Sequence, residues 1–123
     1  MFDWNMNHFE KLTYWQKSRQ LTQEIYTLTA GFPKEEQFGL SSQIRRASVS
    51  ISSNIAEGYG RQYRADYIHF LNVARGSCYE VMSQLILCVD LGFIKEQQAQ
   101  KAKALCEEIG KMLNSTILSL QKK

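Results

Sequence analysis

Residues 40–57, LSSQIRRASVSISSNIAE, carry the clearest structural signal in the sequence. Their apolar side chains recur at intervals of four and three residues, which is the period of one face of an α-helix. These apolar positions are Leu40, Ile44, Ala47, Ile51 and Ile55. We therefore predict an amphipathic helix that begins near Leu40 and is broken at Gly58-Tyr59-Gly60.

Three other segments show the same period. The first runs from His8 or Thr13 to Ala30, and Gly31-Phe32-Pro33 ends it because proline cannot continue a helix. The others span residues 64–91 and 95–120. The apolar positions of the 64–91 segment alternate in steps of four and three: Tyr67, Leu71, Ala74, Cys78, Val81, Leu85 and Cys88. Short connections between the four segments predict a single all-α domain, residues 1–123, folded as an antiparallel up-down-up-down four-helix bundle.

The composition excludes several other classes of protein. With 123 residues, 44% of them apolar and 22% charged, the chain is expected to form one globular domain rather than a disordered segment. One proline and seven glycines provide too little turn chemistry for a β-sandwich or β-barrel. The longest strongly apolar run, residues 85–89, is too short to span a membrane, and residues 1–10 do not resemble a signal peptide. We expect a soluble cytoplasmic protein.

No enzyme, cofactor or metal signature is found. The three cysteines, Cys78, Cys88 and Cys106, form no CxxC pair and are expected to be reduced and structural, the alternative being a reactive or metal-binding role. Asp66 and His69 form one carboxylate–histidine pair where a di-metal bundle needs two Glu-x-x-His motifs. No Gly-x-Ser-x-Gly or phosphate-loop motif is present, so we predict that the protein is not an enzyme.

The formal net charge is +3 and is unevenly distributed. Residues 40–76 hold five arginines against two acidic residues, whereas residues 77–94 hold two acidic residues and no Lys or Arg. Arginine suits forked contacts with phosphate, and four of these arginines are predicted to form a patch that binds the backbone of RNA or DNA. They are Arg45, Arg46, Arg61 and Arg64. The alternative is that they are solvated or ion-paired on a helix surface.

A second set of polar residues accompanies the apolar faces of the second and third helices. It consists of Asn54, Glu57, Arg75 and Glu80. We interpret this set as a structural polar seam in which Arg75 is partly buried and paired with Glu57 or Glu80. Breaking such a pair is expected to cost about 3–5 kcal/mol. The alternative interpretation is a ligand or nucleotide pocket made from the same groups.

Small or partly apolar residues also lie outside the apolar stripes, at Ser48, Val49, Ser52, Tyr59 and Tyr63. A single bundle does not need this second packing surface, so it predicts a homo-oligomer.

Two strings, residues 50–61 (SISSNIAEGYGR) and 67–77 (YIHFLNVARGS), carry a family resemblance, supported by residues 15–18 and 32–36. They resemble the bacterial four-helix-bundle family encoded in intervening sequences of 23S ribosomal RNA genes, also called S23 ribosomal protein. The resemblance covers roughly Leu12 to Leu113, and the accessory variability determinant of diversity-generating retroelements is similar in fold. The family resemblance implies a barrel-like, ring-shaped homopentamer with a basic surface. In the retroelement branch it implies binding to nucleic acid or to a reverse transcriptase.

Two functions therefore remain open. The first is a nucleic-acid-binding accessory protein, in which oligomerisation multiplies a few arginines into a ring of positive charge. The second is a protein-interaction scaffold that docks a partner such as a reverse transcriptase, with charge steering the encounter. Salt dependence of RNA and DNA binding separates them.

Overall fold

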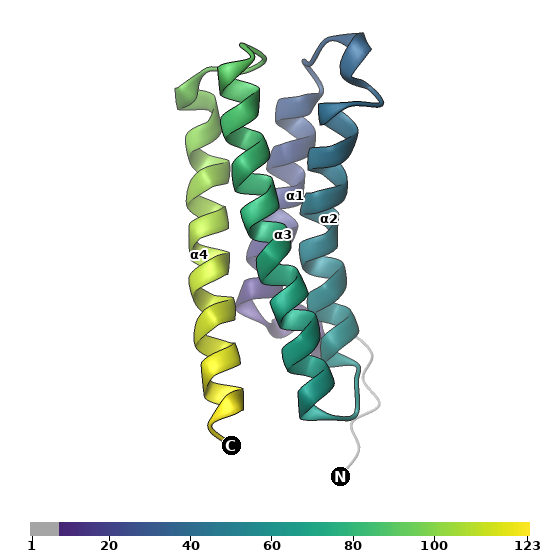
Figure 1. Cartoon of the computed structure of the whole chain (residues 1–123), viewed down its shortest axis with the longest axis vertical. Coiled ribbons are helices and arrows are strands. Elements are labelled where there is room, and N and C mark those ends of the chain that lie inside the picture. Colours follow the sequence, from purple (N-terminus) through teal and green to yellow (C-terminus); the bar gives the residue numbers. More distant parts are fainter. Residues whose placement is uncertain (1–7) are drawn as a thin grey trace.

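The computed structural model describes residues 8–123, which form the predicted four-helix bundle (Figure 1). The helices are α1 (Thr13–Thr29), α2 (Leu40–Tyr59), α3 (Arg64–Asp90) and α4 (Glu96–Gln121). Two short 3-10 helices, η1 (His8–Lys11) and η2 (Lys34–Glu36), precede α1 and α2. No strand is present in residues 8–123, so the all-α prediction is confirmed for the part described. Residues 1–7, which entered the signal-peptide argument, lie outside it.

The helices run alternately up and down, and each packs against two neighbours. α2 and α4 each contact both α1 and α3. The α2–α3 loop, the beginnings of α1 and α3 and the end of α4 therefore meet at one end of the bundle, called the lower end here (Figure 1).

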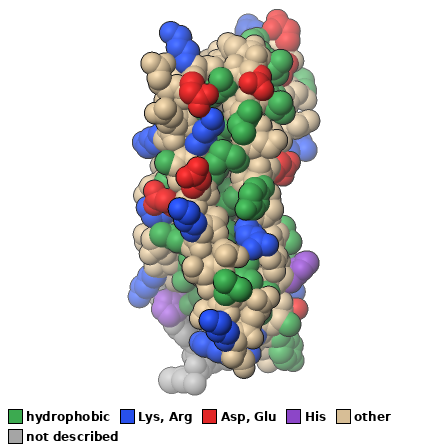
Figure 2. Space-filling view, turned by 60° about the vertical axis from the view of Figure 1, so that its left-hand side comes forward, with side chains coloured by type: hydrophobic (Ala, Val, Ile, Leu, Met, Phe, Trp, Pro, Cys, Tyr) green, Lys and Arg blue, Asp and Glu red, His purple; other side chains and the backbone are tan. Residues whose placement is uncertain are grey.

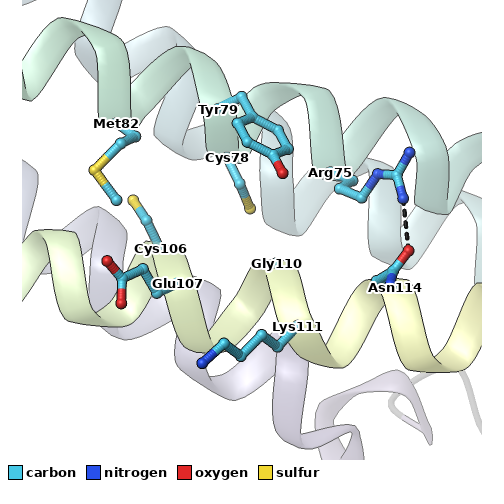
Figure 3. A pocket seen from close by; sticks show the side chains of 9 residues that line it. All are labelled: Arg75, Cys78, Tyr79, Met82, Cys106, Glu107, Gly110, Lys111 and Asn114. Carbon is cyan, nitrogen blue, oxygen red and sulfur yellow. Dashed lines mark hydrogen bonds between the residues drawn. The ribbon is translucent and has the colours of Figure 1, made fainter.

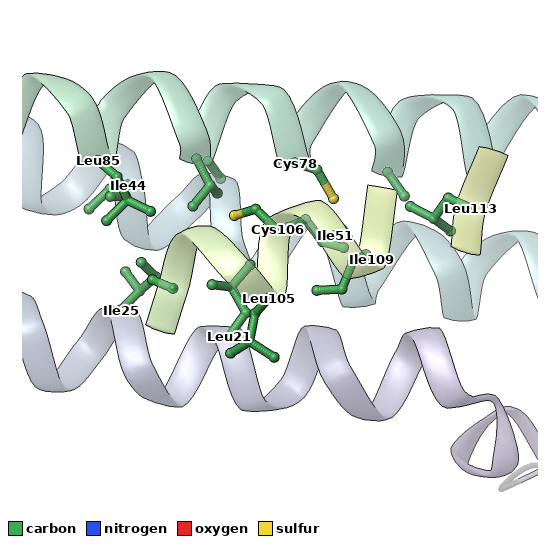
Figure 4. Packing of buried hydrophobic residues seen from close by; sticks show 14 of the residues in the cluster. Leu21, Ile25, Ile44, Ile51, Cys78, Leu85, Leu105, Cys106, Ile109 and Leu113 are labelled. Atoms are coloured by element: carbon green, nitrogen blue, oxygen red, sulfur yellow. The ribbon is translucent and has the colours of Figure 1, made fainter. Parts of the chain in front are cut away.

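The predicted apolar stripes form the core between the helices (Figure 4). Four of the five stripe residues of α2 are buried, and Leu40 is half-buried. The largest fully buried side chains include Leu21 and Ile25 of α1, Ile51 and Ile55 of α2, Leu71 and Leu85 of α3, and Ile109 and Leu113 of α4. Burial of large aliphatic side chains at about 1.5–3 kcal/mol each is the main force that holds the bundle together.

The helix ends follow the expected turn chemistry, with one correction. Gly92 adopts a φ of +78°, and the Phe93 N–H donates to the Cys88 carbonyl at 2.9 Å, which closes α3 as a Schellman motif. Gly58, predicted to break the second helix, lies inside α2 and is buried; the helix ends at Tyr59, one residue before Gly60. Gly58 is needed for close packing rather than for a turn, because a Cβ atom there would lie 2.7 Å from the Cβ of Phe70.

The second packing surface predicted on α2 is smaller than expected. Ser48 is fully buried, whereas Val49, Tyr59 and Tyr63 remain exposed and Ser52 is half-exposed. Ser48 lies one turn after Arg45, which contacts α1, so the buried serine lies on the flank of α2 that faces α1. A small side chain there allows α1 and α2 to approach closely within one chain.

Among residues 8–123, none of the helices is both long and apolar enough to cross a membrane.

Candidate nucleic-acid interface and polar seam

Arg45 and Arg46 lie in the first half of α2 but have different environments. Arg45 is half-buried; its Nε donates to Thr29 Oγ1 at 2.8 Å, and its guanidinium carbon lies 4.5 Å from the ring centroid of Tyr26. Arg45 is therefore held against α1. Arg46 is exposed and has no hydrogen bond or ion pair with any residue in the range 8–123.

Arg61 and Arg64 lie in and beside the α2–α3 loop at the lower end. The Arg61 guanidinium forms an ion pair with Glu57, with 2.9 Å between Nη2 and Oε2, and lies 4.8 Å from the ring centroid of Phe70. Arg64 is the first residue of α3, is exposed, and has no carboxylate partner in the described chain. Arg45 and Arg61 are thus bound by neighbouring side chains, whereas the guanidinium groups of Arg46 and Arg64 are free of hydrogen bonds and ion pairs within residues 8–123.

The four arginines do not form the single patch predicted from the sequence. Arg46 lies thirteen residues before Tyr59 in one continuous helix, which corresponds to about 20 Å along the axis at about 1.5 Å per residue. Arg45 and Arg46 are therefore separated from the loop arginines by most of the length of α2. The sequence indicated which arginines lie near α2 but not how far apart they are.

Exposed aromatic side chains accompany the loop arginines. Tyr63, between Arg61 and Arg64, is 66% exposed, and Tyr59 lies at the end of α2 with 36% exposure. Residues 60–64, Gly-Arg-Gln-Tyr-Arg, are exposed throughout and are called the basic loop here. An arginine and an aromatic ring on one exposed loop provide a phosphate contact and a stacking platform side by side.

The two ends of the bundle differ in charge. At the lower end, residues 8–14, 57–66 and 118–123 carry five Lys or Arg against three Asp or Glu. At the opposite end, residues 30–40 and 89–97 carry two Lys or Arg against four Asp or Glu. On the face shown in Figure 2, most acidic side chains lie in the upper half, while Lys and Arg reach the lower end. The basic loop therefore lies at the positive end of the molecule.

The polar contact between α2 and α3 exists, but most of its members differ from the prediction. Asn54 Nδ2 donates to the backbone oxygen of Ser50 at 2.8 Å and to its Oγ at 2.9 Å. Ser77 Oγ of α3 donates to Ser50 Oγ at 3.0 Å. Of the predicted seam, only Asn54 belongs to this contact; Ser50 and Ser77 complete it.

Glu57, Arg75 and Glu80 do not join that seam, which corrects the sequence prediction. Arg75 Nη1 donates to Asn114 Oδ1 of α4 at 2.7 Å, because Arg75 lies on the flank of α3 that faces α4 rather than α2. Glu57 pairs with Arg61, as described above. Glu80 accepts a long hydrogen bond, 3.4 Å, from Gln84 Nε2 of its own helix.

A pair of tyrosines that the sequence analysis did not identify links α1 to α3. The hydroxyl groups of Tyr14 and Tyr67 are hydrogen-bonded to each other. Burial raises the pKa of both phenols above the usual value of 10.0, so both stay protonated and neutral. In an up-down-up-down bundle α1 and α3 begin at the same end. A tyrosine near the start of each helix could therefore have predicted this contact from the sequence.

All three cysteines are buried and free, and burial is the main cause of their raised thiol pKa. The pKa is raised to about 12 for Cys78 and Cys106 and to about 11 for Cys88. Thiols with such values are not nucleophilic at neutral pH. Within residues 8–123, no three His, Cys, Asp or Glu side chains gather as a metal site requires.

A groove of about 360 Å³ runs between α3 and α4 (Figure 3). Its floor includes Cys78, Cys106 and Gly110, and its rim includes Arg75 and Lys111. The groove lies apart from the basic loop, which is on the α2 side of α3.

Fold and site together define a small helical-bundle protein with an exposed basic loop. A family model described as 23S rRNA-intervening sequence protein matches residues 10–115, and the chain belongs to this family. Among solved structures, it is similar to a protein of unknown function from the S23 ribosomal protein family of Bacteroides thetaiotaomicron VPI-5482. That similarity has a TM-score of 0.77 and 30% sequence identity, and covers 85% of this chain and 98% of the other. No curated protein matches the chain. The family resemblance seen in the sequence is therefore confirmed.

Proposed function

We propose that this protein is a non-enzymatic, cytoplasmic homo-oligomer that binds the phosphate backbone of RNA or DNA. The observation that carries the proposal is the basic loop at the positive end of the bundle. There Arg64 has no carboxylate partner among residues 8–123, and the neighbouring Tyr63 is 66% exposed. An unpaired guanidinium binds phosphate without first breaking an internal ion pair.

Arg46 provides a second contact point along α2. The separation of about 20 Å between the two regions corresponds to about six nucleotides at about 3.4 Å per nucleotide along one strand. A strand following α2 can therefore contact both. Arg45 and Arg61 support these contacts less, because Thr29 and Glu57 already hold their guanidinium groups.

Oligomerisation is the second part of the proposal, and exposed apolar side chains support it. On α3 and just after it, Val73, Ile86, Leu87 and Leu91 are between 39% and 61% exposed, and Val49 of α2 is 39% exposed. Covering such side chains with a second copy removes apolar surface from water. A ring repeats the basic loop once per subunit; the pentamer number comes from the family resemblance alone.

A salt titration of RNA and DNA binding tests the nucleic-acid proposal. We expect Arg64→Gln and Arg46→Gln each to reduce the slope of log K against log salt by about 0.7–0.9, and Arg45→Gln to change it less. Lys101→Gln, an exposed charge removed from α4, is the matched control and leaves the slope less affected. Absence of binding by the unaltered protein at low salt would contradict the proposal and favour a scaffold that docks a protein such as a reverse transcriptase.

Sedimentation tests the oligomer separately. We expect an assembly larger than the 14.2 kDa chain at micromolar concentration, and Leu87→Glu is expected to dissociate it. Gln20→Glu, at an exposed position of α1, introduces the same charge on a helix that carries none of these side chains and serves as the control. A monomer for the unaltered protein contradicts this part of the proposal.

A further inference from the structure

The groove between α3 and α4 has the volume and lining of a small-molecule site. Its volume of about 360 Å³ lies within the range of about 300–1,000 Å³ that is usual for ligand pockets. Cys78 and Cys106 are buried beneath it, and Met82 lines the same wall as Cys78. Because the pKa of both thiols is raised to about 12, this sulfur-rich floor is uncharged at neutral pH.

Gly110 keeps the groove open. A Cβ atom added at this position would meet no atom within 4 Å, although the residue lies in the middle of α4. A glycine inside a helix destabilises the helix relative to alanine. Neither a positive φ nor a close neighbour requires glycine here, in contrast to Gly92 and Gly58. The missing side chain at Gly110 instead leaves the space above α4 empty.

The polar groups of the groove are separated along its length. Arg75 and Asn114 meet at one end, while Glu107 lies near Met82 and Cys106 toward the other (Figure 3). Only one terminal nitrogen of Arg75 is used, by Asn114 Oδ1, so the remaining guanidinium donors can bind a carboxylate. Lys111 adds a second cation on the rim, with no ion-pair partner among residues 8–123.

We propose that this groove binds a small aromatic carboxylate, with the carboxylate at Arg75 and the ring over the sulfur-lined floor. Thioether and thiol sulfur atoms make favourable contacts with aromatic rings, which selects a flat aromatic body over a flexible chain. The guanidinium fork selects the anionic group. Glu107 repels an anion and so fixes the orientation of the ligand. The basic loop takes no part in this site, so the proposal is independent of nucleic-acid binding.

Calorimetric titration with 1-naphthoate and its uncharged analogue 1-naphthamide tests the proposal. We expect naphthoate to bind the unaltered protein about tenfold more tightly than naphthamide, since a hydrogen bond to a charged group contributes at least the ~1.4 kcal/mol that corresponds to tenfold. Arg75→Gln is expected to remove this preference while naphthamide affinity is retained. Equal affinity for the two probes, or no binding of either at millimolar concentration, would overturn the proposal.

Two leucine substitutions on α4 locate the bound probe. Gly110→Leu fills the groove and is expected to abolish naphthoate binding, with the helical circular dichroism signal unchanged. Ala104→Leu adds a larger side chain to an exposed position of the same helix outside the groove and is expected to leave binding unchanged. If Gly110→Leu binds naphthoate as the unaltered protein does, the probe lies elsewhere and the proposal is wrong.

Discussion

The two seams on either side of α3 use small residues in opposite ways. Toward α2, Gly58 lies so close to Phe70 that an added Cβ would be 2.7 Å from the Phe70 Cβ. Toward α4, an added Cβ at Gly110 would meet nothing within 4 Å, and a groove remains. A small residue on a helix therefore does not by itself bring two helices together. The side chain opposite decides whether the space is filled, as Phe70 fills it, or left open.

The largest expected effect comes from placing the same side chain in each seam. Gly58→Leu is expected to destabilise the protein by about 3 kcal/mol, because overpacking a filled seam forces backbone or side chains to shift. Gly110→Leu is expected to raise stability by about 0.5 kcal/mol, because leucine favours the helix and its side chain enters open space. Urea unfolding of both variants measures the difference. Similar losses for the two would contradict the contrast between closed and open seams.

The thiols beneath the open seam give the next effect, a loss of stability at alkaline pH. Burial raises the pKa of Cys78 and Cys106 from 9.0 to about 12. The folded state therefore keeps these protons while the unfolded state releases them. The stabilisation is complete below pH 9 and is lost as the pH rises toward 12. Each thiol contributes at most about 1.4 kcal/mol per pH unit to this loss.

Urea unfolding at pH 7, 9, 10 and 11 measures that loss. Cys78→Ala is expected to be less stable than the unaltered protein at pH 7 but to lose less stability between pH 9 and 11. The difference between the two pH profiles is free of the contribution of Tyr14 and Tyr67, which are present in both proteins and whose raised pKa values act in the same direction. Parallel curves would show that water reaches the floor of the groove and that the Cys78 thiol ionises as in the unfolded chain.

The same contrast explains how much of the molecule could be predicted from the sequence. The helical period is a property of each segment, so the core stripes could be predicted, and most helix ends could be predicted to within about two residues. Ile51 and Leu71 illustrate this, since both lie at predicted stripe positions and both are fully buried. Which flank of a helix meets which neighbour depends on how each helix is rotated in the bundle. Periodicity within one segment does not contain that information.

The candidate site was predicted less completely than the fold for this reason. Arg75 adjoins the core residue Ala74, and a rotation of about 100° per residue places it on one flank of α3 without saying which helix lies there. It contacts α4, not the glutamate of α2. The tyrosine pair and the groove were missed because each needs side chains of two helices at one level. The exposure of the loop around Arg64 could be predicted without knowing how the helices are rotated, because the loop lies between two helical segments of the sequence.

Arg75 provides the smallest effect and the most direct test of this correction. A buried guanidinium that loses a carboxylate partner would leave an uncompensated charge, and its removal would cost about 3–5 kcal/mol. Arg75 instead is half-buried and donates to the neutral amide oxygen of Asn114 in an exposed hydrogen bond. We therefore expect Arg75→Ala to reduce the free energy of unfolding by only about 0.5 kcal/mol.

A double-mutant cycle with Asn114→Ala separates this hydrogen bond from the packing of the arginine stem. Arg75→Met, which keeps most of the stem, is expected to be still closer to the unaltered protein, because the aliphatic part of the side chain covers apolar surface. We expect the coupling energy between positions 75 and 114 to be smaller than the ~0.5 kcal/mol lost in Arg75→Ala, since part of that loss belongs to the stem. We expect no coupling between Arg75→Ala and Glu57→Gln, because Glu57 pairs with Arg61. A loss of several kcal/mol for Arg75→Ala, coupled to Glu57, would restore Arg75 to the α2 side of α3 and remove the cation on which the α3–α4 groove depends.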